Sequence, residues 1–548
     1  MAVFLFGSAL PKHFWDIASH FEREVLVMAL DYIILILYAL GMVAIAYYSR
    51  KRSQSVDEFL HAGKKGVGGW MSAFAYGTTY FSAVIFVGYA GKFGSSFGLA
   101  SVWIGVANAI FGGLVAWKVL AKRTKNMTAR LESKTMPDLF EKRYESKNLK
   151  IASAVIIFVF LIPYSASVYS GLSNIFEIVF GIPGWTVMVA LAALTAVYLF
   201  FGGYFATAVS DFIQGIIMLV GVALMVVWFM KDKPDWSLDL LTSNNNLTWF
   251  TFNSDSTGIY GSTVSLLSLI ILTSFGVWGL PQTIHKYYAI RDKKAIQQGT
   301  IVSTIFALII GFGAYFVGAL YKYYENDITA FLVKNNITSG VTDYFIPVML
   351  KQVIPTGLIG IIAVLILSAS MSTLASVSLS SASACAVDIY KGKINKDASD
   401  KQVNTVMRVL CVVFIGISVL LAVLNEEFGF SAIAYMMGLS WGTLAGCFMG
   451  PFVVGLLWKG VTKKGAWASI ISTLILTAGL ILFFGYHKNG FECTFGKAIT
   501  TGINCSPLIG CICMATSVII TVVVSLFTKK PSDEAIYNAF EKPIENEV

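Results

Sequence analysis

Long apolar runs, each ended by a short group of charged or turn-forming residues, follow one another along nearly the whole chain. Most of them reach the roughly 20 residues that an α-helix needs to cross the hydrocarbon core of a bilayer. The pattern therefore predicts an all-α polytopic membrane protein with about 13 transmembrane helices. We expect them at approximately residues 28–49, 68–94, 97–121, 150–179, 183–201, 203–230, 258–284, 297–322, 355–386, 405–425, 428–458, 464–486 and 507–527.

Two of these runs are interrupted. Gly77 to Thr79 divides the second run, which resumes at Phe81 to Tyr89, and Gly276 to Pro281 divides the seventh. A helix broken inside the membrane frees backbone carbonyls, which protein groups or a bound ion must satisfy. If residues 68–230 and 258–458 are two repeats, both breaks fall in the first helix of a repeat, as in transporters with inverted repeats. The alternative is that these glycines are packing notches.

The ninth run carries hydroxyl groups where other helices carry only apolar side chains. Nine serine and threonine residues lie between Leu365 and Asp388. Na⁺ is a hard cation that prefers oxygen ligands, so Ser372 and Thr373 are candidate ligands of such an ion. The alternative is a small-residue packing seam whose hydroxyls bond back to their own helix.

Composition agrees with the membrane prediction. Of the 548 residues, 56% are hydrophobic and only 13% are charged, whereas soluble domains carry about 25% charged residues. The net charge of +9 does not indicate nucleic-acid binding, because the basic residues occupy short loops between the runs. These loops follow the first, third, seventh and ninth runs, at 50–65, 122–150, 286–294 and 391–401.

Basic loops favour the cytoplasmic side of a membrane. We therefore expect residues 1–27 to form an outside segment (extracellular or periplasmic), 28–527 the transmembrane domain, and 528–548 a cytoplasmic tail. Cys493 and Cys505 share an outside loop in this topology, so a disulfide between them is possible.

Several classes of function are disfavoured. No nucleotide-binding loop is present, which argues against an ATP-driven pump. No nucleophile–base pair and no metal-ligand spacing of His and Asp stands out in the runs, which argues against an enzyme. No obligatory protein partner is evident. A channel remains an alternative function, and it would show no saturable, cation-coupled uptake.

Five segments carry distinctive motifs: EFLHAG at 58–63, TMPDLFEKR at 135–143, FGGY to SDFIQ at 201–214, FGVWGLP at 275–281, and MSTL to DIY at 371–390. Together they resemble the sodium:solute symporter family over nearly the whole chain, and are most similar to its sodium/pantothenate and sodium/proline permease branch. The resemblance implies a LeuT-type 5+5 inverted repeat with flanking helices, Na⁺ as the coupling ion, and a place in the plasma membrane.

The same resemblance implies a Na⁺ site between the second and ninth runs. Its ligands would be the backbone carbonyls of Thr78, Phe81 and Ala369 and the hydroxyls of Ser372 and Thr373. These neutral oxygens suit Na⁺ better than a proton, because none of them titrates near neutral pH.

Two charged residues inside the runs have more than one interpretation. The resemblance suggests that Asp211 belongs to the ion pathway; the alternative is an acid that starts a helix, with Ser210 as a possible cap. Lys92 is able to attract an anion inward, and the alternative is that it snorkels to the outer interface.

The predicted function is Na⁺-coupled uptake of a small organic solute by alternating access. Close proline carriers have an Asp where Tyr80 stands, and the run TTYFSA is more similar to pantothenate-type members, which disfavours proline. We expect the solute to be a carboxylate, an amino acid or a vitamin-like acid. Sugar carriers use an acid and an amide where Ile104 and Pro281 stand here. The alternatives are a sugar or sialic acid symporter, a proton-coupled carrier and a channel-like member. The candidate solute-lining residues are Tyr80, Ser82, Tyr164, Trp278, Gln282, Tyr435 and Trp441.

Overall fold

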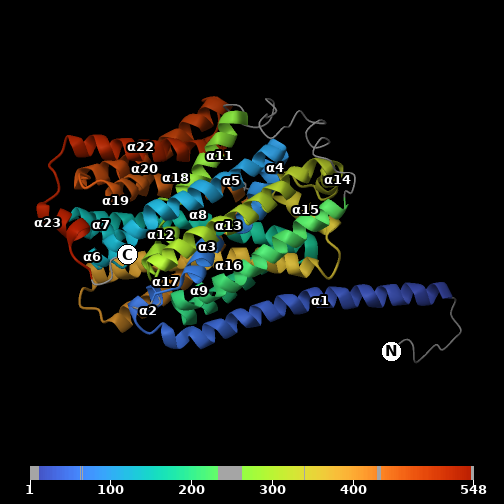
Figure 1. The fold of residues 1–548 in the computed structure, drawn as a ribbon. Coiled ribbons are helices and arrows are strands. Elements are labelled where there is room, and N and C mark those ends of the chain that lie inside the picture. The colour runs from blue at the N-terminus through green and yellow to red at the C-terminus, as the bar shows by residue number, and fades with distance from the viewer. Residues whose placement is uncertain are drawn as a thin grey trace.

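The chain folds into an elongated bundle of helices (Figure 1). The computed structural model describes residues 12–61, 63, 66–232, 262–338, 340–428 and 433–544. In these residues the only strand-like pairing is one isolated bridge between Val67 and Ile290. Helix α1 (Lys12–Ser49) lies along one edge of the bundle, and α20 (Lys463–Asn489) and α22 (Ser506–Leu526) lie along the opposite edge.

Eleven helical segments of the described chain are long and apolar enough to cross a membrane. The principal helices between α1 and α20 are α2 (Val56–His61), α3 (Gly69–Tyr80), α4 (Ala90–Phe97), α5 (Val102–Ala107), α6 (Lys122–Leu131), α7 (Met136–Tyr144), α8 (Lys147–Phe180), α9 (Gly184–Asp232), α11 (Ser262–Gly276), α12 (Pro281–Tyr288), α13 (Lys293–Ala319), α14 (Glu325–Lys334), α15 (Phe345–Val353), α16 (Ile359–Ser383), α17 (Asp400–Phe428), α18 (Ile433–Phe448) and α19 (Gly455–Leu457). Two shorter helices, α21 (Phe495–Ile503) and α23 (Asp533–Ile536), flank α22.

Two of the eleven segments each contain more than one predicted run. A straight helix as long as α9, with 49 residues, would extend about 74 Å, more than twice the hydrocarbon thickness of a bilayer. Gly203 breaks it with φ +58° and ψ −162°, so the chain turns there and forms two spans. Gly98, with φ +54°, breaks the segment Val84–Leu131 in the same way. The eleven segments therefore agree with the prediction of about 13 crossings.

The break in the second run lies later than the sequence predicted. Helix α3 continues through Gly77 to Thr79 and ends at Tyr80; Phe81 has an extended backbone, and a π-helical turn follows at Val84–Tyr89. Thr78 and Thr79 are accommodated inside the helix, since their hydroxyls donate to the carbonyls of Phe74 and Ala75 in the preceding turn, at 2.8 and 2.6 Å. Gly77 is a packing notch, since a Cβ there would lie 2.5 Å from the Phe306 ring.

The break in the seventh run is confirmed. Helix α11 ends at Gly276 and α12 begins at Pro281, where a proline is favourable because the first helical N–H has no partner in any case. The hydroxyl of Thr283 is within 2.9 Å of the Val277 carbonyl and 2.8 Å of the Leu280 carbonyl. At any one time, one of the backbone oxygens freed by the break is thus satisfied by a hydroxyl of the protein.

Helix α16 lies in the interior of the bundle and packs against α1, α3, α8, α9 and α17. Nearly all of its residues are buried, including its serines. On one side of this core, paired glycines let backbones touch, as small residues do in membrane helices. Gly94 of α4 lies against Gly318 of α13, and Gly105 of α5 lies against Gly311 of α13.

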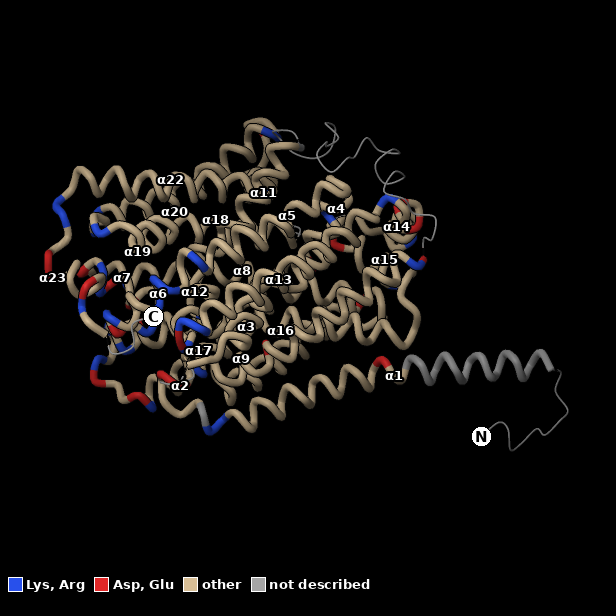
Figure 2. The backbone as a smooth tube through the Cα atoms, viewed as in Figure 1, with Lys and Arg blue, Asp and Glu red and all other residues tan. Residues whose placement is uncertain are grey.

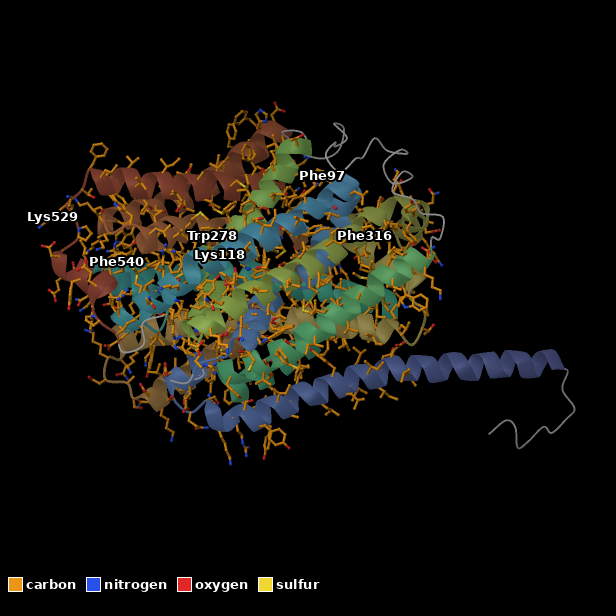
Figure 3. The ribbon with its side chains drawn as sticks, viewed as in Figure 1. Phe97, Lys118, Trp278, Phe316, Lys529 and Phe540 are labelled. Carbon is orange, nitrogen blue, oxygen red and sulfur yellow. The ribbon has the colours of Figure 1, made fainter. Side chains whose placement is uncertain are left out.

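Charged residues gather at the ends of the bundle, and its middle is almost free of them (Figure 2). Lys and Arg are concentrated at the end that carries α2, α6, α7 and α23. Figure 3 marks this end by Lys529 and Phe540 and the opposite end by Phe97 and Phe316. The two ends correspond to the two faces of a membrane.

Candidate functional site

Hydroxyls of α16 meet the end of α3 in a buried oxygen cluster. The Ser372 hydroxyl donates to the Thr78 hydroxyl at 2.7 Å. The Thr373 hydroxyl lies 3.3 Å from the carbonyl oxygens of both Thr78 and Thr79 and 3.1 Å from that of Ala369. The structure thus brings together four of the five residues predicted as Na⁺ ligands.

Phe81, the fifth predicted ligand, is the first residue beyond α3. Its amide donates to the Gly77 carbonyl at 3.1 Å, and its backbone is extended, with ψ 115°. An extended residue at a helix end directs its carbonyl out of the helical hydrogen-bond pattern. All five predicted ligands are fully buried, with exposed fractions of 0–1%.

The composition of this cluster fits Na⁺. The single proton of the Thr373 hydroxyl faces three carbonyl oxygens, but a hydroxyl donates only one hydrogen bond at a time. Acceptors therefore outnumber donors, and a cation would satisfy the surplus lone pairs. Because every oxygen in the set is neutral, a monovalent ion is the appropriate charge.

A buried ion pair lies next to this cluster. The Lys286 ammonium of α12 is 3.4 Å from the Asp211 carboxylate of α9 and 2.9 Å from the Ser376 hydroxyl of α16. Ser376 in turn lies 2.9 Å from the Thr79 hydroxyl. The exposed fractions of the Lys286 and Asp211 side chains are 2% and 0%. Four helices meet at this pair.

Sequence reasoning missed the pair. The seventh predicted span ends at residue 284 and leaves Lys286 in a basic loop, whereas α12 continues to Tyr288. The alternative that Asp211 starts a helix is wrong, because Asp211 lies inside α9, and Ser210 donates back to Ala206 and Thr207, both at 3.0 Å. The signal in the sequence is the position of Lys286, within one turn of the end of the predicted span. A lysine that lies inside the membrane region needs a partner, such as an acidic side chain.

Three of the candidate solute-lining residues form an aromatic cluster around Trp441. Its ring stacks on Tyr80 at 5.7 Å and meets Tyr164 edge-on at 5.6 Å. The Tyr80 hydroxyl donates to the Thr273 carbonyl at 2.6 Å. The Tyr164 hydroxyl lies next to Ser82 and Thr373, so this cluster adjoins the oxygen cluster.

Two polar atoms of this cluster, the Tyr164 hydroxyl and the Trp441 indole nitrogen, are buried without a hydrogen-bond partner among the described residues. Both amide atoms of Gln282 on α12 are also buried and unpaired there. Buried polar groups are nearly always paired in folded proteins. Unpaired donors and acceptors beside one another indicate a place where a ligand supplies the missing bonds.

The other two candidate lining residues have different surroundings. The Trp278 indole donates to the Phe111 carbonyl at 3.0 Å, and its ring packs on Phe275. Tyr435 lies under the Lys92 ammonium, 4.6 Å from the ring centre. Both Tyr435 and Lys92 line a cavity of about 210 Å³ at the end of the bundle that carries Phe97 (Figure 3). Lys488 also lines it, as does Cys505, which like Cys493 is a free thiol.

Asp343 lies near Lys92 and contacts the start of α18. It is buried, and its carboxylate accepts a hydrogen bond from the Ile433 amide at the start of α18, at 3.1 Å. Burial raises the pKa of Asp343 to about 6, although the Lys92 charge acts in the opposite direction. This carboxylate lies outside the membrane-spanning segments and is able to respond to pH.

We expect the Asp343→Asn variant to be more stable than the native protein at pH 8 and equally stable at pH 4. The folded-state pKa of Asp343 is above its unfolded value, so protonation stabilises the fold below about pH 4, and this contribution is lost as pH rises through about 6. The difference is on the order of 3 kcal/mol. Thermal unfolding of both proteins across this pH range measures it. Parallel pH profiles would show that Asp343 does not titrate in this way.

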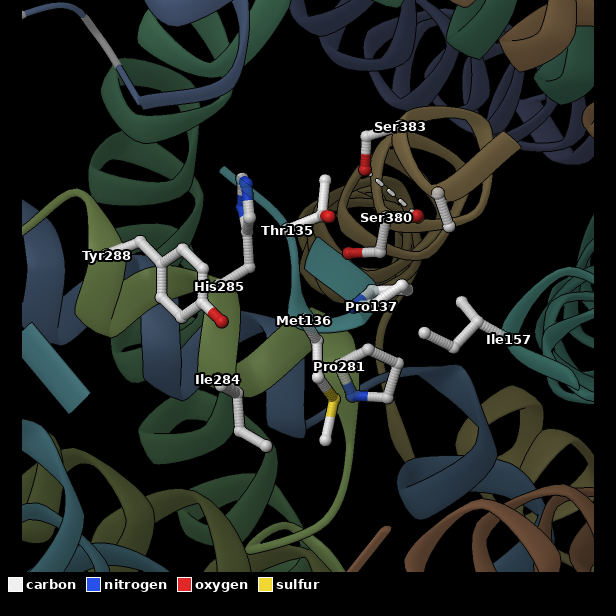
Figure 4. A pocket seen from close by; sticks show the side chains of 11 residues that line it. Thr135, Met136, Pro137, Ile157, Pro281, Ile284, His285, Tyr288, Ser380 and Ser383 are labelled. Atoms are coloured by element: carbon white, nitrogen blue, oxygen red, sulfur yellow. Dashed lines mark hydrogen bonds between the residues drawn. The ribbon is translucent and has the colours of Figure 1, made fainter. Parts of the chain in front are cut away.

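A small cavity lies toward the basic end of the bundle (Figure 4). His285 and Tyr288 of α12 face Thr135, Ser380 and Ser383 across it. Ser380 follows Ser376 by one turn of α16, so the cavity continues the line of hydroxyls that begins at Ser372. Its volume of about 10 Å³ has room for one water molecule.

Ionic contacts surround this cavity. The Thr135 hydroxyl is 2.9 and 2.7 Å from the two carboxylate oxygens of Asp388. The Lys150 ammonium lies 2.8 Å from Asp138, 2.9 Å from Glu141 and 3.5 Å from Asp388. These contacts join α7, α8 and the turn after α16, and they close the basic end of the bundle.

Comparisons with known proteins agree with this geometry. A family model described as "Sodium:solute symporter family" matches residues 59–473. The osmoregulated proline transporter OpuE of Bacillus subtilis (strain 168) is 26% identical over 509 residues, which cover 92% of this chain and 96% of the relative. The sodium/proline symporter of Staphylococcus aureus (strain JH9) is 26% identical over 521 residues, covering 91% and 93%.

Among solved structures, the substrate-bound outward-open state of a Na⁺-coupled sialic acid symporter superposes with a TM-score of 0.71 at 18% identity, covering 92% of this chain and 99% of that one. The fold is therefore the LeuT-type fold. The protein is a multi-pass transporter of the plasma membrane, and it couples Na⁺ influx to the uptake of a small organic solute. The chain belongs to the sodium:solute symporter family.

Proposed function

We propose that the coupling Na⁺ binds between α3 and α16. Its ligands are the carbonyls of Thr78, Phe81 and Ala369 and the hydroxyls of Ser372 and Thr373. The observation that carries this proposal is the position of the Thr373 hydroxyl, within 3.3 Å of carbonyls from both helices. The end of α3 at Tyr80 makes the carbonyls of its last turn available, so ion binding depends on the broken helix.

The solute site adjoins the ion site. Tyr80, Ser82, Tyr164, Gln282 and Trp441 line it, and Trp278 and Tyr435 line the path toward it. These side chains offer hydroxyls, an amide and an indole beside large apolar rings, but no carboxylate. A small carboxylate with an apolar body matches them best, and an amino acid would need another partner for its ammonium group. Two relatives are named for proline, so proline belongs in the first test.

Coupling follows from the contact between the two sites. Thr373 is an ion ligand in this proposal, and its hydroxyl lies next to that of Tyr164. Na⁺ binding braces α3 against α16 and thereby orders the aromatic cluster for the solute. Each ligand then favours the same occluded state, which is the thermodynamic condition for symport. The two repeats, 68–230 and 258–458, rock against each other to release both ligands.

The basic end of the bundle faces the cytoplasm. Figure 2 shows Lys and Arg concentrated there, and basic residues favour the cytoplasmic side. This orientation puts residues 1–27 outside, the membrane domain at 28–527 and the tail 528–548 inside. Na⁺ leaves past Asp211, Ser376 and Ser380 toward the small inner cavity.

Uptake into proteoliposomes tests the function. Labelled pantothenate, proline, short monocarboxylates, sialic acid and galactose are each supplied under an inward Na⁺ gradient and, as a control, under an equal K⁺ gradient. Accumulation of one compound with Na⁺ alone identifies the solute. Accumulation driven by a proton gradient without Na⁺ would contradict the proposed ion site.

We expect Tyr164→Phe to raise the KM for the solute about three- to tenfold, because it removes one hydrogen bond worth about 0.5–1.5 kcal/mol. Its thermal stability should stay unchanged, because the hydroxyl has no partner in the described protein. Tyr169→Phe is the matched control: it lies on the same helix, is equally buried and has a hydroxyl that is also unpaired there. Equal KM values for the two variants would remove Tyr164 from the solute site.

A further inference from the structure

The Lys286 ammonium lies two hydrogen bonds away from the proposed Na⁺ site. It contacts the Ser376 hydroxyl at 2.9 Å, and this hydroxyl contacts that of Thr79 at 2.9 Å. The Thr79 carbonyl then lies 3.3 Å from the Thr373 hydroxyl. On the other side, Ser372 lies beside the Asp211 carboxylate. The Asp211 carboxylate therefore neighbours both the Lys286 ammonium and Ser372, one of the proposed Na⁺ ligands.

The surroundings of this ammonium are those of a cation site. A carboxylate oxygen and a hydroxyl lie within 3.4 Å, and the Tyr204 ring centre lies at 5.1 Å. The second carboxylate oxygen of Asp211 is buried and has no hydrogen-bond partner in the described part of the chain. Carboxylate and hydroxyl oxygens are also ligands that a hard metal cation prefers.

Stability does not explain such a pair. Bringing two charges into a low-dielectric interior costs several kcal/mol for each ion, and an apolar pair of similar volume is often as stable or more stable. Charged groups inside the membrane region of a protein mark ion pathways and substrate sites by default. A functional role for the Lys286 charge is therefore the better explanation.

We propose that the Lys286 ammonium takes the place of a second coupling cation. The protein then binds one Na⁺, whereas without this ammonium Asp211 would attract a second Na⁺. This inference rests on the proposed Na⁺ site. The tethered charge neutralises Asp211 in every state of the cycle and does not leave with the solute. It also repels Na⁺ in the neighbouring site, which favours ion release toward the cytoplasm.

Removing the ammonium should create a second Na⁺ site from Asp211, Ser376 and Ser372. Equilibrium binding of ²²Na⁺ to the purified full-length protein tests this without knowledge of the solute. We expect one bound Na⁺ per native chain and two per Lys286→Gln chain, with a Hill coefficient that rises above one. Lys286→Arg keeps the charge and should still bind one Na⁺.

The double variant Lys286→Gln/Asp211→Asn removes both charges and should also bind one Na⁺. Two Na⁺ bound to the native protein, or one bound to folded Lys286→Gln, would overturn the inference. Proton uptake on Na⁺-free Lys286→Gln in place of a second Na⁺ would overturn it too. Where Lys286→Gln does not fold, Asp211→Asn is the second variant. It leaves the ammonium beside the site without its carboxylate, so it should weaken binding of the one Na⁺, and native Na⁺ affinity in folded Asp211→Asn would overturn the inference.

Failure of the proposed Na⁺ site has a different signature. Ser372→Ala/Thr373→Ala should lose the Na⁺ that the native protein binds. If that variant keeps it with native affinity, the site between α3 and α16 is wrong, whatever Lys286 does. If Ser372→Ala/Thr373→Ala loses the Na⁺ but the Lys286 variants do not bind the expected number of Na⁺ ions, the site between α3 and α16 stands and the inference about the second cation fails.

Discussion

Replacing Ser372 and Thr373 together by alanine is expected to raise the Na⁺ concentration for half-maximal uptake by at least a hundredfold. The change removes two of the five proposed ligands, and a hydrogen-bonding contact with a charged group is worth about 1.5–3 kcal/mol. A difference of about 1.4 kcal/mol is tenfold in affinity. Uptake of the solute as a function of Na⁺ concentration measures the effect.

Ser370→Ala is the matched control for this variant. Ser370 lies on the same helix and is equally buried, but its hydroxyl donates to the Ile366 carbonyl of its own helix at 2.7 Å. Its Na⁺ dependence should be native. If the double variant also keeps the native dependence, Ser372 and Thr373 do not bind the coupling ion.

Gly318→Ala is expected to destabilise the bundle by about 1–3 kcal/mol or to prevent its assembly, which is the range for overpacking a tight interior. A Cβ at Gly318 would lie 2.1 Å from the backbone oxygen of Ala90, and backbone cannot move aside as a flexible side chain does. Thermal unfolding in detergent, together with the yield of monodisperse protein, reports the change.

Gly416→Ala provides the contrast. Gly416 lies inside α17, and a Cβ there would have no atom within 4 Å. Alanine is a better helix former than glycine by up to about 1 kcal/mol, so this variant should be as stable as the native protein or more so. Equal losses in both variants would show that the close contact between α4 and α13 does not limit stability.

The sequence predicted those features that have a local signature. Spans are visible because a helix that crosses a bilayer needs a continuous apolar run. The break at Gly276 to Pro281 is visible because proline restarts a helix at its own position. The cluster at Ser372 and Thr373 is visible because hydroxyls are unusual in so apolar a helix.

The position of the first break was wrong for an equally physical reason. Gly77 to Thr79 have the composition of a helix break, but threonine hydroxyls bond back to the preceding turn and glycine accommodates a neighbouring ring, so the helix continues. Phe81, the first residue beyond α3, has an extended backbone but carries no such mark in the sequence.

Local sequence patterns do not indicate the Lys286–Asp211 pair. The two residues are separated by 75 positions along the chain, and each alone has a simple explanation, as a loop charge or as a helix start. They meet only because α12 and α9 both pack against α3 and α16. Pairing between distant positions is information that one sequence does not contain.

The glycine turn inside α9 has an electrical consequence. Gly203 reverses the chain at the basic end of the bundle, and Asp211 follows it by eight residues, or about 12 Å of helix. The hydrocarbon core is about 30 Å thick, so this carboxylate lies well inside the membrane electric field. In the proposed orientation, Na⁺ entering from outside crosses more than half of that field before it reaches the site. Moving one elementary charge across a potential of 100 mV is worth about 2.3 kcal/mol. A resting membrane potential therefore contributes directly to the free energy of Na⁺ binding as well as to that of transport.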